Sequence, residues 1–225
     1  SKFAKSGEMI ANITHQFRQP LNNISYILMN LKKRFENKNL DESYFDKKVL
    51  QANEQLNFLS KTIDDFKEFY SLSKEKEIFS VKDAILNATT ILSADLKNHN
   101  IELETSFETF EEVKIFGVKS ELSQVLIAII SNSIDVLKNI KNPKIKINIF
   151  SNSAEVIICI LDNGGGIKPK NIKKIFEPYF STKEEGTGIG LYLSKMIIEE
   201  SFAGKILVEN KKEGVLFSLF IEKAL

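Results

Sequence analysis

The stretch Glu155–Gly166 reads EVIICILDNGGG. Residues 156–161 are apolar and mostly β-branched, which is typical of a buried strand. Asp162 follows directly, and its carboxylate can accept a hydrogen bond from an exocyclic amine. Three glycines then allow the backbone to approach a flat ligand closely. A tight turn or a cation loop is the alternative, but a turn needs fewer glycines, and the ligand spacing of an EF-hand is missing.

Further strands and helices are predicted on both sides of this stretch. The strands are expected at Glu77–Val81, Ile101–Phe107, Val113–Val118, Lys144–Phe150, Glu155–Leu161, Lys205–Asn210 and Gly214–Glu222, the last two as a closing hairpin. The helices are expected at Val81–Asn98, Ser120–Asn139 and Thr187–Phe202. Mixed strands with helices on one face predict an α+β sandwich.

Residues 1–73 have a different pattern, with one glycine and one proline. Apolar residues recur at alternating steps of four and three, as in the seam of a helical bundle, with one slip where residues 13, 17 and 21 give two steps of four. The seam comprises Ile10, Ile13, Phe17, Leu21, Ile24, Leu28, Leu31 and Phe35, then Phe45, Val49, Ala52, Leu56, Leu59, Ile63, Phe66 and Tyr70. The polar segment Glu36–Tyr44 separates the two rows and offers Asn39 and Asp41 as N-caps.

These rows predict a helical hairpin. Two helices enclose little core, so we expect the hairpin to dimerise into a four-helix bundle, and packing of the seam on the second domain is the alternative. The polar segment Ser71–Glu77 is interpreted as a linker, which gives an all-α domain at 1–73 and an α+β domain at 74–225.

Composition narrows the classes of function. The 225 residues carry 31 basic and 30 acidic side chains, a net charge of +1 that argues against a general nucleic-acid binder. Cys159 is the one cysteine, so no intrachain disulfide is expected and the chain resembles an intracellular protein. No apolar run is longer than Val156–Leu161, which is far shorter than the roughly 20 residues of a membrane-spanning helix. We therefore predict a cytoplasmic fragment without membrane contact; no signal peptide is visible, and the helical start suggests a piece of a longer protein.

Of the two histidines, His15 is the better functional candidate. It lies two residues from both Ile13 and Phe17, so it is expected to point away from the seam, and Pro20 is expected to bend the same helix. Gln19, four residues on, shares its face. A surface histidine beside an accidental bend is the alternative. His99 is interpreted as part of a solvated helix end.

Two more clusters suggest a phosphate and metal site. The run GTGIGL at Gly186–Leu191 leads into a predicted helix, where glycines expose amides that bind phosphate. It matches neither a dinucleotide fingerprint nor a Walker loop, and a flexible loop is the alternative. The apolar helix before it carries Glu121, Gln124, Asn132 and Asp135. Asn132 is expected to be buried, where its carbonyl oxygen suits magnesium.

Together these stretches resemble the catalytic core of a bacterial sensor histidine kinase over nearly the whole chain. His15–Leu21 (HQFRQPL) resembles the phosphoacceptor box and one recognised subtype of it. The segments Gln124–Asp135, Asp162–Gly166, Phe176–Phe180 (FEPYF) and Gly186–Leu191 resemble the N box, first glycine box, F box and second glycine box. The ATP-binding half also resembles gyrase, the Hsp90 chaperone and MutL, the GHKL type of fold.

The resemblance implies roles for particular residues. His15 would be the phosphorylated nucleophile, with Gln16 and Gln19 beside it in the catalytic box. Asn132 would hold Mg²⁺, Asp135 on the same helix would bind ATP, and Asp162 would bind the adenine amino group of ATP. The nucleotide and its phosphates would be lined by Gly164, Gly166, Thr187, Gly188, Ile189, Gly190 and Leu191. The segment Ile167–Glu185 would be a mobile lid, and its Lys183 either a phosphate contact or a solvated lysine.

Three residues depart from the family pattern. Gln16 stands where an acid usually follows the histidine, Gln19 where Asn or Thr is often found, and Ala128 where the N box often has its first asparagine. The expected function is an ATP-dependent histidine kinase that acts as a homodimer and passes its phosphoryl group to a response regulator receiver domain. A dimeric nucleotide-binding scaffold without phosphotransfer is one alternative, and a plain ATPase of the gyrase–chaperone type is another.

Overall fold

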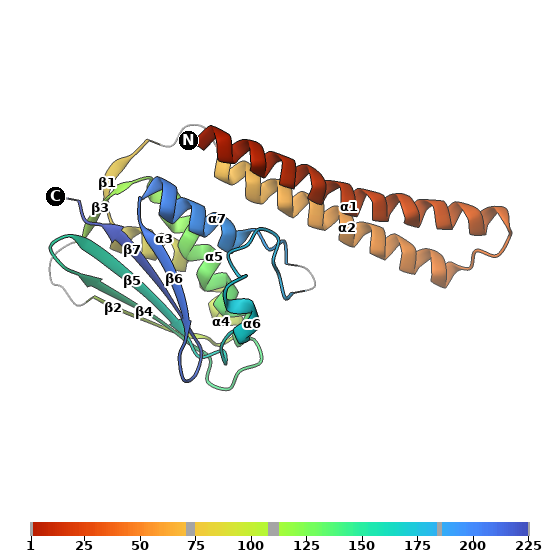
Figure 1. Cartoon of the computed structure of the whole chain (residues 1–225). Helices are drawn as coiled ribbons and strands as arrows, with labels where there is room; N and C mark the ends of the chain where they lie inside the picture. The colour runs from red at the N-terminus through yellow and green to blue at the C-terminus, as the bar shows by residue number, and fades with distance from the viewer. Residues whose placement is uncertain (1, 71–74, 108–112, 184–185, 225) are drawn as a thin grey trace. The chain divides into compact units, whose positions relative to one another are not determined.

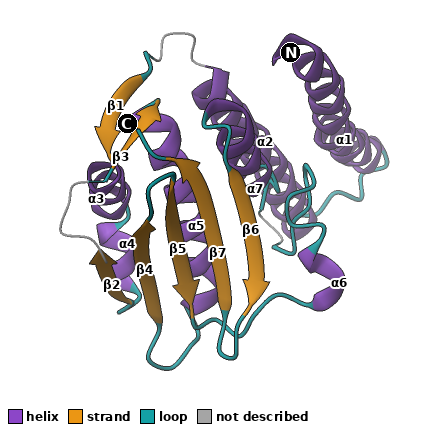
Figure 2. Ribbon diagram, turned by 60° about the vertical axis from the view of Figure 1, so that its left-hand side comes forward, coloured by secondary structure: helices purple, strands orange, loops and turns teal. Residues whose placement is uncertain are grey.

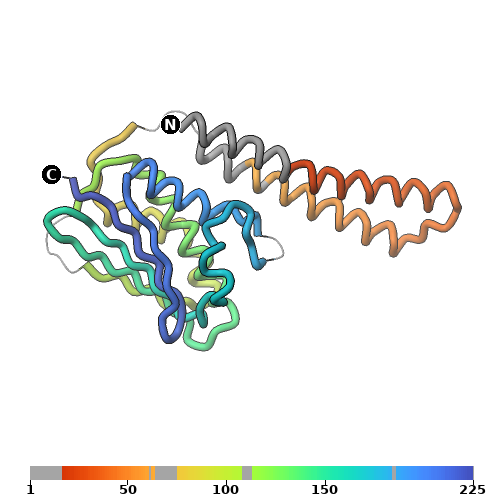
Figure 3. The backbone as a smooth tube through the Cα atoms, in the orientation of Figure 1, coloured from red at the N-terminus to blue at the C-terminus, as the bar shows by residue number. Residues whose placement is uncertain are grey.

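The computed structural model describes residues 2–70, 75–107, 113–183 and 186–224, which Figure 1 draws as coloured ribbon with the remainder in grey. Figure 3 traces the same backbone, with a larger part of the hairpin in grey. The chain divides into two compact units, Ser1–Glu68 and Phe69–Leu225. The predicted domain boundary after residue 73 falls among residues 71–74, which lie outside the described ones, so its position stays a prediction.

The first unit is a helical hairpin of α1 (Lys2–Glu36) and α2 (Glu42–Tyr70). α1 runs without interruption through Pro20. Asp41 caps α2, because its Oδ1 accepts a hydrogen bond from the Tyr44 N–H at 2.8 Å. Arg34 closes the same end: its guanidinium lies 3.7 Å from the centre of the Tyr44 ring and 3.8 Å from Asp41 Oδ2. The predicted hairpin and one of its two candidate caps are thus confirmed.

The predicted seam separates into an inner and an outer row. Ile24, Leu31, Ala52 and Leu59 are half-buried between the helices, together with the buried Ile27, which the prediction omitted. The outer row is exposed by 38% to 73% and comprises Leu21, Leu28, Phe35, Phe45, Val49, Leu56 and Ile63. On each helix its members are four or seven residues apart, so they lie on one face of that helix. We call this surface the apolar stripe.

The second unit contains a five-stranded sheet in the order β2-β4-β5-β7-β6, seen in Figure 2. β2 (Glu102–Phe107) pairs parallel with β4 (Lys144–Ser151), and every other pair in the sheet is antiparallel. The remaining strands are β5 (Glu155–Asp162), β6 (Lys205–Asn210) and β7 (Val215–Glu222). β1 (Glu77–Ser80) and β3 (Lys114–Gly117) form a separate antiparallel pair.

Helices cover one face of the sheet (Figure 2). They are α3 (Val81–Ile91), α4 (Ser93–Asn98), α5 (Lys119–Leu137) and α7 (Gly190–Met196), with the short α6 (Pro169–Ile172) in the loop before α7. Leu122, Leu126 and Ile130 of α5 are fully buried. They join a core that includes the inward residues of β4 and β5, which alternate with outward ones. The α+β prediction is confirmed.

α5 is long and apolar enough to cross a membrane, by length and composition alone. No other helix among the described residues meets both conditions. More than half of α5 is buried inside this unit, as in the core helix of a globular domain.

Two predicted helices differ from the observed ones. The helix expected at Val81–Asn98 is broken at Leu92, which separates α3 from α4. The Thr89 hydroxyl donates to the Ile85 carbonyl at 2.9 Å, a contact that weakens the end of α3. The helix expected from Thr187 begins at Gly190 and ends in a π-helical turn, η1 (Ile197–Ser201).

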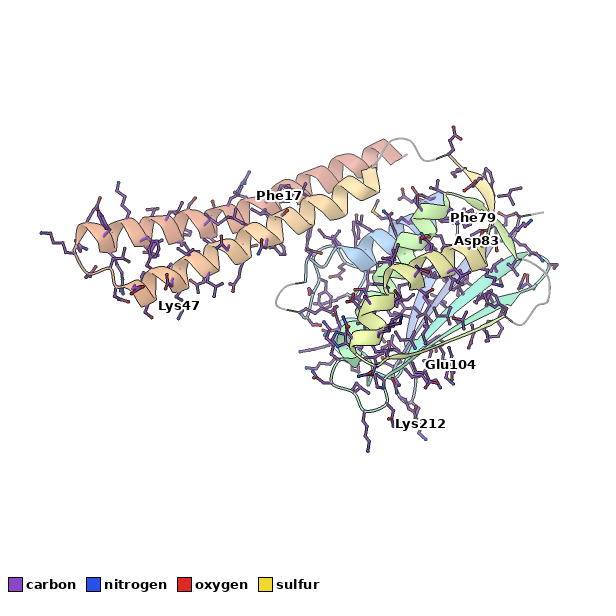
Figure 4. The ribbon with its side chains drawn as sticks, turned by 180° about the vertical axis from the view of Figure 1, so that it is seen from behind. Phe17, Lys47, Phe79, Asp83, Glu104 and Lys212 are labelled. Atoms are coloured by element: carbon purple, nitrogen blue, oxygen red, sulfur yellow. The ribbon has the colours of Figure 1, made fainter. Side chains whose placement is uncertain are left out.

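Aromatic residues join the small β1-β3 pair to the main core. Phe79 of β1 packs edge-to-face on Phe202, with ring centres 6.4 Å apart. Asp83, close to Phe79 in Figure 4, pairs with Lys119 at the start of α5 at 3.5 Å. These contacts tie the start of α5, the helix that carries the predicted N box, to the first elements of the unit.

Candidate functional site

Asp162 is the last residue of β5, and only 4% of it is exposed. Its Oδ1 accepts hydrogen bonds from the backbone N–H groups of Gly164, at 2.8 Å, and Val215, at 3.4 Å. Its Oδ2 accepts a hydrogen bond at 3.1 Å from the hydroxyl of Ser133, a buried residue of α5. Three donors therefore orient this buried carboxylate, and Oδ2 keeps acceptor capacity for a ligand.

The turn between β6 and β7 closes tightly on Asp162. A Cβ at Gly214 would collide with the Asp162 carbonyl, so only glycine fits there. The Gly165 N–H donates to the Glu213 carbonyl at 2.9 Å. Lys212 extends from the same turn in Figure 4. The first glycine box is thus held against the C-terminal hairpin of the sheet, a contact that sequence reasoning did not include.

Side-chain amides fix both ends of the first glycine box. The Asn163 Oδ1 accepts a hydrogen bond from the Lys144 N–H at 2.8 Å. After Gly166, the Ile167 backbone exchanges two hydrogen bonds with the Asn210 amide, at 2.7 and 2.8 Å. Asp162, Gly164 and Gly166 are therefore brought together in a loop with little freedom.

A second group of polar residues lies around Asn132 and Asp135 of α5. Lys183 Nζ donates to Asn132 Oδ1 at 2.7 Å and to Asp135 Oδ2 at 2.6 Å. Lys138 Nζ approaches the other oxygen of the same carboxylate, Asp135 Oδ1, at 2.7 Å. Asn132 is half-buried, which corrects the expectation of a buried amide, because its side chain faces Lys183 and not the core.

Partial burial raises the pKa of Asp135, but the hydrogen bonds and charges of Lys138 and Lys183 outweigh it. The pKa of Asp135 therefore lies below its ordinary value, and the carboxylate is ionised at neutral pH.

Asn132 and Asp135 supply too few oxygen ligands to hold a divalent cation by themselves. The described residues contain no cluster of three His, Cys, Asp or Glu side chains placed to hold a metal. Magnesium, however, commonly binds through one or two protein oxygens together with substrate phosphates. The Asn132 carbonyl oxygen and the Asp135 carboxylate already receive a cationic ammonium, so this donor set fits a cation that arrives with phosphates.

The second glycine box packs against the F box. Gly188 has φ +66°, and a Cβ there would collide with the Tyr179 carbonyl carbon. The Tyr179 N–H donates to the Gly188 carbonyl at 2.9 Å, and Tyr179 itself has φ +66°. Burial raises the pKa of the Tyr179 phenol to about 12, with a smaller contribution from Tyr192. Thr187 and Ile189 are buried beside this contact.

Gly190 is the first residue of α7, and a Cβ there would lie 3.7 Å from Cβ of Ala128. The small Ala128 therefore faces the glycine box where the family pattern has an asparagine. Leu191, the next residue of α7, is partly buried against the core.

The F box anchors the segment before Lys183. Phe176 packs edge-to-face on Phe217, with centres 6.4 Å apart, and Phe180 also contacts the core. Glu184 and Glu185, the last residues of the predicted lid, lie outside the described residues.

α5 joins the two halves of the site. Ser133 faces Asp162, while its neighbour Asn132 faces Lys183. Ser133 was missed from the sequence, although its place between Asn132 and Asp135 was the available signal.

The predicted phosphoacceptor box lies on the hairpin. His15 and Gln16 belong to α1, but their side chains lie outside the described ones, and Gln19 is exposed on the same helix. Their roles stay predictions.

Comparisons with known proteins agree with this geometry. Residues 117–225 match the family of histidine kinase-, DNA gyrase B- and HSP90-like ATPases. The chain is 29% identical to the two-component sensor PprA of Pseudomonas aeruginosa over 225 residues, which cover 96% of this chain and 24% of that protein. It therefore spans about a quarter of the length of this relative.

Solved histidine kinases share the fold. The catalytic domain of histidine kinase ThkA is 30% identical, with a TM-score of 0.61 over 66% of this chain and 96% of that chain. The same kinase in complex with response regulator protein TrrA covers 99% of this chain and 63% of that chain, with 28% identity and a TM-score of 0.71.

The fold and the Asp162 loop define an ATP-binding domain of this ATPase class. Because similarity to histidine kinases extends over the hairpin as well, the chain belongs to the sensor histidine kinases.

Proposed function

We propose that this chain is the kinase core of a two-component system, which transfers the γ-phosphoryl group of ATP to His15 and then to an aspartate of a response regulator. The observation that carries the proposal is the buried Asp162 carboxylate, oriented by Ser133 and two backbone amides at the end of β5.

The Asp162 carboxylate supports binding of an adenine nucleotide in preference to a guanine nucleotide. Its Oδ2 would accept a hydrogen bond from the exocyclic amine of adenine. Guanine presents a carbonyl oxygen at the corresponding position, and two acceptors in a buried site repel each other.

Asn132 and Asp135 would receive Mg²⁺ together with the triphosphate, and the ion would supply neutralisation of the phosphate charge. The amides of Gly188 and Gly190 and the ammonium of Lys183 would bind phosphate oxygens beside it. Phosphoryl transfer depends mainly on such positioning and charge stabilisation.

His15 Nε2 would attack the γ-phosphorus, forming a nitrogen–phosphorus bond as the bond to the bridging β-γ oxygen breaks and ADP leaves. The ring then releases its Nδ1 proton. Gln16 cannot accept that proton, but a histidine of ordinary pKa, about 6.5, is mostly neutral at pH 7 and needs little base assistance.

The apolar stripe supports the dimer. Seven apolar side chains, each at least 38% exposed, recur along one face of α1 and one face of α2. Two copies that face each other through this stripe would complete a four-helix bundle.

The test is incubation of the protein with γ-labelled ATP and Mg²⁺. Labelled protein whose label is acid-labile and alkali-stable is expected, as for a phosphoramidate. Free phosphate without labelled protein would indicate an ATPase, and the absence of both would indicate a nucleotide-binding scaffold.

A further inference from the structure

Lys183 contacts Asn132 and Asp135, the two residues that would bind Mg²⁺ under the proposed function. Its ammonium donates to Asn132 Oδ1 at 2.7 Å and pairs with Asp135 Oδ2 at 2.6 Å. Both are shorter than an ordinary N–H···O hydrogen bond, as expected for charged partners. The Lys183 side chain is 39% exposed, and it makes these two polar contacts at its ammonium end.

The backbone before the lysine is also held in place. The Lys183 N–H donates to Ser181 Oγ at 3.0 Å, and the Ser181 hydroxyl lies 3.2 Å from the Lys183 carbonyl. Phe180, just before this turn, packs on the core. The turn therefore presents Lys183 to α5 from a fixed position.

Charge at this point disfavours a free metal ion. Asp135 is the one carboxylate in the contact, and Lys138 and Lys183 already pair with its two oxygens, both at close range. The three side chains together carry a net charge of +1. A divalent cation that enters without phosphates meets two ammonium groups for one carboxylate, and at such distances like charges repel strongly.

We propose that Lys183 occupies the place of the divalent cation in the nucleotide-free protein, so that metal enters only together with nucleotide. The proposal rests on the proposed function, since the exchange needs a triphosphate. Phosphate oxygens offer more negative charge than Asp135 and Asn132, so the Lys183 ammonium moves to the phosphates. The freed Asn132 and Asp135 oxygens then receive the metal. Nucleotide and metal therefore bind cooperatively, and Lys183 is a positioning residue for both.

The test measures binding of Mn²⁺ alone to the full chain by electron paramagnetic resonance, without nucleotide. Lys183→Met removes the competing charge and keeps most of the side-chain length. We expect it to bind Mn²⁺ at least about tenfold more tightly than the parent protein. Lys183→Arg keeps the charge and should exclude the ion as the parent does.

Lys174→Met is the matched control. Lys174 is exposed in the same segment, and its side chain has no hydrogen bond or ion pair with any described residue. Its Mn²⁺ affinity should equal that of the parent. Equal Mn²⁺ affinity of the parent and Lys183→Met, including no detectable binding to either, overturns the proposal.

Calorimetric titration of the parent protein with ATP and Mg²⁺ separates this inference from the proposed function. A parent that does not bind ATP refutes the proposed function, whereas the Mn²⁺ comparison of the variants tests the place of Lys183 directly.

Discussion

The hairpin and the second unit (the α/β unit) differ in how far they bury their apolar side chains. In the α/β unit, the inward positions of β4, β5 and α5 are almost completely buried within a single copy of the chain. In the described part of the hairpin, Ile27 is buried, while Leu28, Phe35 and Leu56 are at least half exposed. The α/β unit therefore buries its apolar residues by itself, whereas the hairpin exposes an apolar stripe, which the proposed dimer would cover.

The two units also have different roles under the proposed function. The α/β unit orients Asp162 with three hydrogen bonds, which would allow this carboxylate to distinguish adenine from guanine under the proposed function. The hairpin carries His15, which must meet ATP and then a receiver domain under the proposed function. Five experiments test how far the two units are separate.

Replacing His15 with alanine should remove the label from the protein completely, because the variant has no nucleophile. ATP affinity should stay within about twofold, since the nucleotide residues lie in the other unit. The measurements are labelling with γ-labelled ATP and calorimetric titration with ATP. His99→Ala, at the end of α4, is the control and should label normally. A loss of ATP affinity in His15→Ala would contradict the separation of the two units.

Replacing Leu28 and Leu56 together with aspartate should convert the proposed dimer to a monomer. Both lie on the apolar stripe, 59% and 50% exposed, so the hairpin itself should still form. Burial of each leucine in a dimer contributes roughly 1.5–3 kcal/mol. Light scattering should show the molar mass halved. Leu86 of α3 is 53% exposed, and Leu86→Asp should leave the molar mass unchanged. A double variant that remains a dimer would show that the interface lies elsewhere.

Replacing Leu126 with alanine should destabilise the α/β unit by about 2–5 kcal/mol, because the fully buried side chain leaves a cavity. Urea unfolding followed by circular dichroism measures the change. Leu86→Ala, at an exposed position, should cost less than about 1 kcal/mol. Similar losses for both variants would mean that the core of this unit is loosely packed.

Replacing Ser133 with alanine should weaken ATP binding about tenfold. The Asp162 carboxylate would lose one of three donors, and a hydrogen bond to a charged group contributes about 1.5–3 kcal/mol. Labelling of His15 at saturating ATP should be nearly unchanged. Ser131→Ala on the same helix is the control, and an equal loss there would mean that the effect comes from α5 as a whole.

Replacing Gln16 with glutamate should raise the labelling rate by only a few fold. The new carboxylate can accept the imidazole proton, but the ring is already mostly neutral and the added charge repels ATP. Initial rates from pH 6 to 9 measure the effect. If the rate and pH profile match those of the parent, residue 16 lies outside the proton path.

Periodicity predicted much of this fold. Alternation with period two located β4 and β5, and the apolar run located α5, because each element buries one face. The steps of four and three located the hairpin. They did not separate Ile24, which faces the partner helix, from Leu28, which faces outward, since both satisfy the same spacing.

The candidate site was predictable residue by residue but not as a set of contacts. Asp162 and Asn132 stood out as polar groups beside apolar runs. Ser133 did not, because a small residue in a core helix commonly fills space. The contact of Lys183 with Asp135 joins residues 48 positions apart and depends on the turn at Ser181. The π-helical turn η1 left no signal in the apolar pattern.

The order of the strands has a consequence for synthesis on the ribosome. β7 follows every other strand in the sequence, yet it lies inside the sheet between β5 and β6. β6 pairs with β7 in this sheet, so it cannot join before residues 215–222 have left the exit tunnel. The hairpin, by contrast, ends at Tyr70, before the first strand of the α/β unit. Because domains fold as units from the N-terminal end during translation, the proposed dimer would allow two nascent hairpins on one messenger RNA to pair before either sheet is complete.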